Sequence, residues 1–182
     1  KFYCHKEIAT YQAAPERDNT LFYRSAGGGY WIAILNKPFD SETTSNRSAS
    51  FNALYRAKVF SALLNSSLFW WYYSCNYDLF NFTEGWMFGC NFTYPIKDLE
   101  EALIRLSNQM EKSLRKNAQY YLINSKTNGL QNTVTYRKYF SKNIMDEIDK
   151  VLAKHYGFTE EELDFIINYD IKYRMGDELN EE

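Results

Sequence analysis

Residues 59–73, VFSALLNSSLFWWYY, constrain the fold more than any other stretch, because an apolar helical run is broken by a polar Asn-Ser-Ser step and then resumes as aromatics. Val59, Leu63 and Leu64 recur at helical spacing, and the aromatic side chains extend a broad apolar face that a sheet or other helices must cover. The run is too short and too polar to span a membrane. We predict a helix over about residues 54–73, with Asn65 hydrogen-bonded across to a neighbouring strand or loop.

The sequence predicts strands before this helix and another helix after it. Strands are expected over 21–24 and 30–35, joined at the glycines 27–29, which suit a hairpin turn or, less commonly, a phosphate-binding nest. An irregular aromatic loop is expected over 76–89 and a further strand over 92–96. Asp98 is expected to cap a helix reaching about residue 123. Its predicted apolar face consists of Leu99, Leu103, Leu106, Met110 and Leu114.

The remaining residues predict a polar, mobile loop and two further helices. The loop is expected over 124–132, one helix runs from Ser141 to a stop at Gly157, and Thr159 with Glu162 forms a capping box for the last helix. The predicted class is α+β: a small twisted β-sheet domain with one aromatic helix over 1–96, and a helical part over 97–182.

Charge is distributed unevenly along the chain, although the net charge is only −2. Residues 1–140 carry sixteen Lys and Arg against eleven Asp and Glu, whereas residues 141–182 carry five against twelve. This asymmetry fits a basic DNA-facing part with an acidic end that faces water or another domain. It equally fits a solvated acidic helix beside an ordinary body.

The three cysteines, Cys4, Cys75 and Cys90, form no C-x-x-C unit and cannot all pair, so structural thiols are expected rather than zinc ligands or disulfides. Four Asn-x-Ser/Thr triplets suggest a secreted glycoprotein, but one of them, at Asn65, lies within the predicted apolar helix. The chain starts at Lys1 without a signal-like segment. We expect a piece of a cytoplasmic protein.

Several stretches taken in order resemble a known family. In chain order they are LFYRSAGGGYW at 21–31, the Ser-Ala-Ser-Phe step at 48–51, ALLNSSLFWWYY at 62–73, the Tyr94-Pro95-Ile96 step, and DEIDKVLAKHYGFTEEELDFIINYDIKYR at 146–174. Together they resemble the C-terminal target-recognition region of TaqI-like and Eco57I-like adenine-specific DNA methyltransferases, including enzymes fused to a restriction endonuclease. The resemblance implies that residues 1–96 form a target-recognition domain for double-stranded DNA.

The resemblance also implies that the chemistry lies elsewhere. Family members carry an Asn/Asp-Pro-Pro-aromatic catalytic tetrapeptide and an S-adenosylmethionine loop in an upstream methyltransferase domain. Here Pro15, Pro38 and Pro95 are the only prolines and none is adjacent to another, so the tetrapeptide is absent. S-adenosylmethionine is then a cofactor of the full-length protein, with Mg²⁺ if a nuclease is fused. The expected partners are DNA and the upstream domain, with no membrane.

Residues that read DNA are predicted in the loops, because Arg recognises guanine and Asn or Gln recognises adenine, while Lys and Ser mostly contact the backbone. Each candidate is more simply explained as an ordinary exposed polar residue. The candidates are Arg24 and Tyr30 beside the glycine turn, Arg47, Ser48 and Ser50 in a second loop, Asn76 and Tyr77 after the aromatic helix, and Lys126, Arg137 and Lys138 near the polar loop.

No catalytic constellation stands out in the sequence. His155 is expected to complement a helix dipole, and Asp146, Glu147 and Asp149 are expected to form a solvated helix face with Lys150. Three other functions remain open. They are a protein-interaction module docking through the aromatic loop 76–89, a carbohydrate-binding module, and a DNA-recognition domain like that of a type I specificity subunit.

Overall fold

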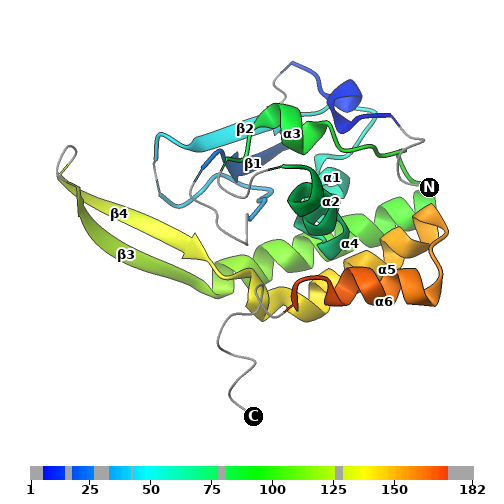
Figure 1. The fold of residues 1–182 in the computed structure, drawn as a ribbon. Helices are drawn as coiled ribbons and strands as arrows, with labels where there is room; N and C mark the ends of the chain where they lie inside the picture. The colour runs from blue at the N-terminus through cyan, green and yellow to red at the C-terminus, as the bar shows by residue number, and fades with distance from the viewer. Residues whose placement is uncertain are drawn as a thin grey trace, which may run out of the picture.

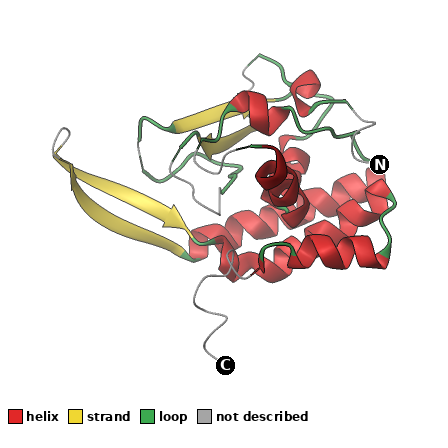
Figure 2. Ribbon diagram, in the orientation of Figure 1, coloured by secondary structure: helices red, strands yellow, loops and turns green. Residues whose placement is uncertain are grey.

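A computed structural model describes residues 6–14, 18–26, 33–41, 43–77, 81–125 and 129–171. Two small antiparallel sheets and six α-helices occur within these ranges, which confirms the α+β class (Figure 2). The elements are η2 (Ile8–Tyr11), β1 (Thr20–Arg24), β2 (Asn46–Ser50), α1 (Ala57–Asn65), α2 (Ser67–Asn76), α3 (Glu84–Phe88), α4 (Lys97–Lys116), β3 (Ala118–Ser125), β4 (Gly129–Tyr136), η3 (Lys138–Ser141), α5 (Lys142–Tyr156) and α6 (Glu160–Asn168).

The polar step in the aromatic stretch is a helix break, so the predicted single helix over 54–73 is wrong. Ser66 adopts an extended backbone, with φ −75° and ψ 163°, which ends α1 and begins α2. Its hydroxyl accepts a hydrogen bond from the Phe69 amide at 3.0 Å and so caps α2. A serine side chain that satisfies an orphan amide favours a helix start over a continuous helix.

Asn65 bonds across to another segment, as predicted. Its side chain is fully buried and pairs with both backbone groups of Ile34: Nδ2 donates to the Ile34 carbonyl at 2.8 Å, and Oδ1 accepts from the Ile34 amide at 3.2 Å. The buried amide thereby satisfies a stretch of backbone that would otherwise lose its hydrogen bonds to water.

A second buried polar side chain holds the start of α2. Asp149 lies on α5 and is only 2% exposed, which corrects its predicted place on a solvated face. Its two carboxylate oxygens accept hydrogen bonds from the amides of Ser67 and Leu68, both at 3.1 Å. The carboxylate thus neutralises the positive end of the α2 dipole and fastens α2 to α5.

The apolar core is built around α1 and is rich in aromatic rings. Phe60 stacks on Phe51 at a centroid distance of 4.2 Å, and Phe92 meets it edge-on at 5.8 Å. The apolar face predicted for the long helix is confirmed for Leu103, Leu106, Met110 and Leu114, all at most 3% exposed. These residues belong to the same buried cluster as Phe51, Phe60 and Phe92. The core therefore runs across the boundary predicted at residue 96.

The first sheet differs from expectation in its second strand. β1 forms as predicted, but it pairs with β2, so the stretch predicted as a second loop containing Arg47, Ser48 and Ser50 is a strand. The strand predicted over 30–35 is represented by Leu35, whose amide and carbonyl both pair with Phe22. The glycine turn at 27–29 and residues 30–32 lie outside the described ranges. The strand predicted over 92–96 is replaced by a single bridge between Glu7 and Asn91.

The long helix ends earlier than predicted, and a β-hairpin follows it. α4 begins at Lys97, with Asp98 in its first turn, and ends at Lys116. Asn117 caps the end by donating from Nδ2 to the Ser113 carbonyl at 2.9 Å. Residues 118–125 and 129–136 pair as β3 and β4, whereas the predicted helix continued to about 123 and the predicted mobile loop covered 124–132. The alternating aromatic, branched and threonine side chains of this stretch favour strand over helix.

The two C-terminal helices agree with the sequence patterns. Gly157 ends α5 in the left-handed conformation at φ 66°, which suits a residue without Cβ. Thr159 and Glu162 form the predicted capping box of α6. The described cysteines, Cys75 and Cys90, are free thiols, and burial raises the pKa of the Cys90 thiol.

Replacing Asp149 with Ala should lower the free energy of unfolding by about 2–3 kcal/mol, because two amides at the buried start of α2 lose a charged acceptor. Urea unfolding followed by circular dichroism measures the change. Glu147→Ala is the matched control, since this exposed neighbour pairs only with Lys150 on the helix surface among its described ion pairs and should change stability by less than about 0.5 kcal/mol. Equal effects of the two substitutions would contradict the assigned role of Asp149.

Candidate nucleic-acid interface

The hairpin of β3 and β4, here called the arm, extends away from the helical body (Figure 1). Its strands pair in register from Ala118↔Tyr136 at the root to Ser125↔Gly129 toward the tip. Exposed apolar side chains are concentrated on it, including Tyr120, Leu122 and Leu130, which are 63%, 65% and 64% exposed. An isolated two-stranded hairpin is only marginally stable in water, so the arm depends on its attachment to the body.

Asp40 fastens the root of the arm. Its Oδ2 atom accepts hydrogen bonds from the hydroxyls of Tyr120 at 3.0 Å and Tyr136 at 3.3 Å. Its Oδ1 atom pairs with the Arg115 guanidinium at 2.8 Å. Burial raises the pKa of Tyr136, so the phenol remains protonated and able to donate at neutral pH. Both strands of the arm and the end of α4 therefore meet at one carboxylate.

Arg24 provides the second attachment of the arm. Its Nη1 atom donates to the Val134 carbonyl on β4 at 2.8 Å, its Nη2 atom to the Ser41 hydroxyl at 3.0 Å, and its Nε atom to the Asn46 side chain at 3.3 Å. The guanidinium also lies 4.8 Å from the centre of the Phe39 ring. Burial lowers the pKa of Arg24 from its ordinary high value. Arg24, predicted to contact a base, is thus half-buried and holds the arm to the β1–β2 sheet.

Arg137 lies at the other side of the root, just after β4. Its Nε atom donates to the Gln119 side chain at 3.0 Å and its Nη2 atom to the Tyr121 hydroxyl at 3.3 Å. Tyr121 in turn donates to Gln119, which joins the three polar side chains on the arm. The hydrogen bond with Tyr121 is the main cause that raises the pKa of Arg137 above its ordinary value. Among the predicted cations that the structure describes, Arg137 bonds to side chains of the arm from its root.

The other predicted site residues are scattered. Arg47 and Ser48 are exposed on β2, whereas Ser50 is 9% exposed and its hydroxyl lies 2.7 Å from that of Thr20. Lys138 is 5% exposed, so its side chain offers little surface to a partner. Tyr30 and Lys126 lie outside the described residues.

Asn76 and Tyr77 lie at the end of α2. Asn76 donates to the Tyr72 carbonyl at 2.6 Å, and Tyr77 stacks on Trp86 of α3 with ring centroids 5.0 Å apart. The stretch predicted as an irregular aromatic loop contains the helix α3 and is folded inward over its described part, where Phe82 and Phe88 are each 1% exposed. The structure does not join these residues to Arg24 and Arg137.

The chain around the arm is basic without interruption. Residues 112–145 contain seven Lys and Arg and no Asp or Glu. Lys112 and Lys116 are exposed on the last turns of α4, directly before β3. Among the described ion pairs, Arg115 pairs with Asp40 and Glu111, and Lys142 pairs with Asp146, all carboxylates from outside the stretch. The root of the arm therefore offers positive charge to an anionic partner.

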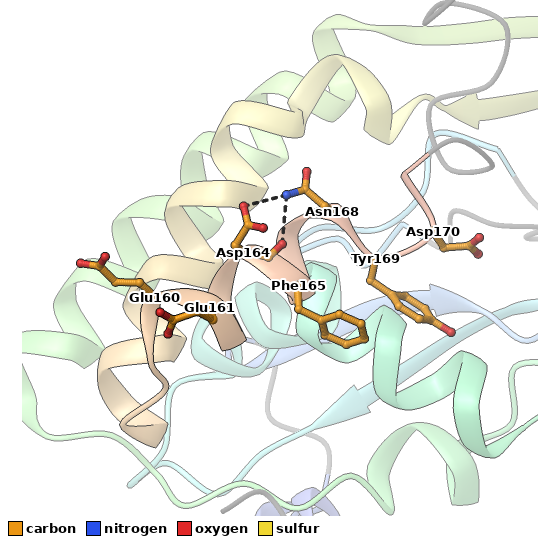
Figure 3. A pocket seen from close by; sticks show the side chains of 7 residues that line it. All are labelled: Glu160, Glu161, Asp164, Phe165, Asn168, Tyr169 and Asp170. Atoms are coloured by element: carbon orange, nitrogen blue, oxygen red, sulfur yellow. Dashed lines mark hydrogen bonds between the residues drawn. The ribbon is translucent and has the colours of Figure 1, made fainter.

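The acidic side of the molecule lies on α6, which Figure 1 shows well apart from the arm. A shallow hollow there is lined by four acidic residues together with two rings and one amide: Glu160, Glu161, Asp164, Asp170, Phe165, Tyr169 and Asn168 (Figure 3). Asn168 Nδ2 donates to the Asp164 carboxylate at 2.9 Å. Because like charges repel, this face disfavours contact with DNA phosphates and orients the molecule with the arm toward them.

The arm was missed by the sequence-based prediction because its first strand was taken as the end of the long helix. A signal was present: the run QYYLI, a polar stretch with Gly129, and the run TVTY together are typical of a hairpin. The amide and hydroxyl side chains of the arm that the prediction overlooked are Gln119, Asn124, Asn132, Thr133 and Thr135.

In comparisons with known proteins, no family, curated sequence or solved structure matches this chain. Among the described helices, none has the length and apolar character needed to cross a membrane. Within the same described ranges, His, Cys, Asp and Glu side chains form no group of three or more that could hold a metal ion.

Arg24→Ala should loosen the arm, because the Val134 carbonyl loses its charged donor and the Phe39 ring loses its covering cation. We expect faster amide hydrogen exchange over residues 118–136 and a loss of about 2 kcal/mol in unfolding free energy. Arg24→Lys should restore little of the lost stability, since an ammonium group cannot reproduce the planar set of donors by which the guanidinium reaches its three acceptors. Arg47→Ala is the control, because this exposed arginine bonds only to nearby backbone among the bonds described; equal exchange in both variants would refute the anchoring role.

Proposed function

We propose that this chain is a DNA-recognition module in which the arm enters a groove of duplex DNA. The observation that supports this most is the shape and chemistry of the arm: a two-stranded ribbon, fixed at its root and extending from the body, with amides and hydroxyls on its surface (Figure 1). The major groove admits a two-stranded ribbon, and amide side chains are the groups that recognise adenine edges.

The charge distribution supports the same proposal. A protein gains most of its affinity for DNA from Lys and Arg that displace counterions from phosphates. The stretch 112–145 supplies cations without any carboxylate, and Lys112 and Lys116 stand at the junction of α4 and the arm. With the ribbon in the groove, these two ammonium groups are the natural contacts for the flanking phosphates.

We further propose, from the family resemblance in the sequence, that the module serves an adenine-N6 DNA methyltransferase or a fused restriction–modification enzyme. In such an enzyme the module holds one side of the recognition site while the upstream domain flips the target adenine and transfers the methyl group. S-adenosylmethionine then binds the upstream domain, with Mg²⁺ at a fused nuclease, and this chain contributes no catalytic residue. The proposed setting is the cytoplasm, where such enzymes meet DNA.

One observation favours a second function, that of a protein-docking module. The arm exposes Leu122, Ile123 and Leu130 to 65%, 50% and 64%, which is unusual for a free surface. The aromatic loop at 76–89 favours it less, because its described rings Phe82 and Phe88 are buried.

Replacing Lys112 and Lys116 together with Ala should weaken duplex binding for all sequences. The slope of log K against log salt concentration should fall in magnitude by about 1.8, as expected for two lost phosphate contacts. Fluorescence anisotropy of a labelled duplex, titrated at several salt concentrations, measures both quantities.

The control is the double substitution Lys150→Ala/Lys154→Ala. These exposed lysines have the same spacing on α5, and Lys154 lies in the last turn of α5 as Lys116 does in that of α4. The control pair should leave affinity and salt slope unchanged. If both double substitutions reduce the salt slope equally, DNA does not bind preferentially at the junction of α4 and the arm, and the proposed interface is wrong.

In the longer polypeptide that the enzyme proposal requires, Lys112→Ala/Lys116→Ala should raise the KM for DNA without changing the binding of S-adenosylmethionine. Methyl transfer to duplex DNA from labelled S-adenosylmethionine measures the first quantity, and equilibrium dialysis measures the second. Weakened S-adenosylmethionine binding would place the cofactor site against this module. A coding sequence upstream of Lys1 that lacks the Pro-Pro-aromatic tetrapeptide would exclude this enzyme class.

A further inference from the structure

One face of the outer arm combines apolar and amide side chains in a regular pattern. Residues directly opposite each other on paired strands share a face of the ribbon. Leu122 lies opposite Asn132, and Asn124 lies opposite Leu130. Each pair therefore joins one apolar side chain to one amide. The leucine lies on β3 in the first pair and on β4 in the second.

This Leu/Asn face is open to solvent, unlike the root of the arm. Nearer the root, Val134 is fully buried and Tyr136 is 6% exposed. Beyond them Leu122 and Leu130 are 65% and 64% exposed, and Asn124 and Asn132 are exposed as well. Two leucines held in water at the outer half of an anchored ribbon gain free energy when a partner covers them.

The charge of the surrounding chain selects the partner. No carboxylate occurs in residues 112–145, and Lys112, Lys116 and Arg137 lie at or near the root of the arm. A polyanion is therefore favoured over a neutral or basic protein surface, which offers no negative charge to these cations. The occupant must also present apolar groups beside hydrogen-bonding groups, because the face carries both.

An A·T base pair presents this combination in the major groove. Adenine offers its N6 donor and N7 acceptor, which an Asn side chain can bind together, and thymine offers its C5-methyl group to an apolar side chain. Two residues along a strand advance about 6.8 Å, which is close to two base-pair steps of about 3.4 Å. The two Leu/Asn pairs can therefore face base pairs two steps apart, with adenine on opposite strands.

We infer that the Leu/Asn face of the arm reads A·T base pairs in the major groove, with Asn124 and Asn132 on adenine and Leu122 and Leu130 on thymine methyl groups. This inference rests on the proposed DNA-recognition function and adds the base pairs that the arm selects.

The test uses duplexes enriched from a random pool by binding to the wild-type chain and remade with uracil in place of thymine. Uracil lacks the C5-methyl group but pairs normally. We expect wild-type affinity to fall about fourfold for each methyl group that loses an apolar contact. The variant Leu122→Ala/Leu130→Ala should bind more weakly overall and should not distinguish thymine from uracil.

A matched control is Phe165→Ala, which removes an exposed apolar side chain, 55% exposed, from α6. It should keep the full sensitivity to uracil. In a parallel series, 7-deazaadenine removes the N7 acceptor and should weaken binding by the wild type but not by Asn124→Ala/Asn132→Ala. The exposed positions of these four arm residues mean that the variants should fold, which circular dichroism verifies.

The outcomes separate this inference from the proposed function. Duplex binding that is insensitive to uracil and to 7-deazaadenine would overturn the inference and leave the arm as a backbone-binding element. An absence of duplex binding by the wild type would overturn both. Self-association without DNA that Leu122→Ala/Leu130→Ala abolishes would assign the face to a second copy of the chain and also overturn the inference.

Discussion

The contact between the Asp149 carboxylate and the first amides of α2 is the interaction on which the rest of the structure depends. The chain breaks at Ser66, and a break in a buried helix leaves backbone amides without partners. Asp149 supplies two acceptors at 3.1 Å and is itself 2% exposed. On the other side of the break, Asn65 satisfies the backbone of Ile34. These two buried polar residues join α1, α2 and α5 to the segment that leads to the arm root.

This frame matters because the arm cannot hold its position alone. Arg24, Asp40 and Arg115 connect the arm to the β1–β2 sheet, to the segment following Leu35, and to the end of α4. All three supports lie on elements that pack against the central core. A ribbon held at its root loses little further conformational entropy on entering a groove, so more of its contact energy can appear as affinity. The acidic face of α6 lies apart from the arm and repels DNA phosphates, which favours an orientation of the molecule with the arm toward DNA.

Local patterns predicted part of this architecture. The cap of α6, the glycine stop of α5, the apolar face of α4 and the cross-bonding of Asn65 follow from residue chemistry over a few positions, and all are present. The exposure predicted for Asp149 was wrong because its neighbours in sequence are charged, and only tertiary packing brings α2 over it. The arm was missed because Tyr120 to Ile123 continue a helical apolar pattern as well as a strand pattern. The capping of α4 at Asn117 and pairing with residues 129–136 decide between the two.

Some of the predicted site residues are already used by the fold, for a related reason. Residue type indicates what a side chain can bind, but not whether the fold already uses it. Arg24 has the right chemistry for a guanine, yet the Val134 carbonyl, Ser41 and Asn46 already accept its hydrogen bonds. Lys138 has the right charge for a phosphate, yet it is buried. Asn132 and Gln119 drew no notice in sequence, because only the hairpin register reveals that they lie on an extended ribbon.

Hydroxyl-radical footprinting of the chain with and without duplex DNA tests most directly whether the arm is the DNA-binding element. Tyr120, Tyr121, Leu122 and Leu130 are reactive side chains that are 63%, 42%, 65% and 64% exposed, and Phe165 on α6 provides an internal reference at 55%. If the arm is the DNA-binding element, DNA slows oxidation of the four arm residues and leaves that of Phe165 unchanged. Protection of Phe165 with the arm still fully reactive, under conditions where DNA is bound, would contradict it.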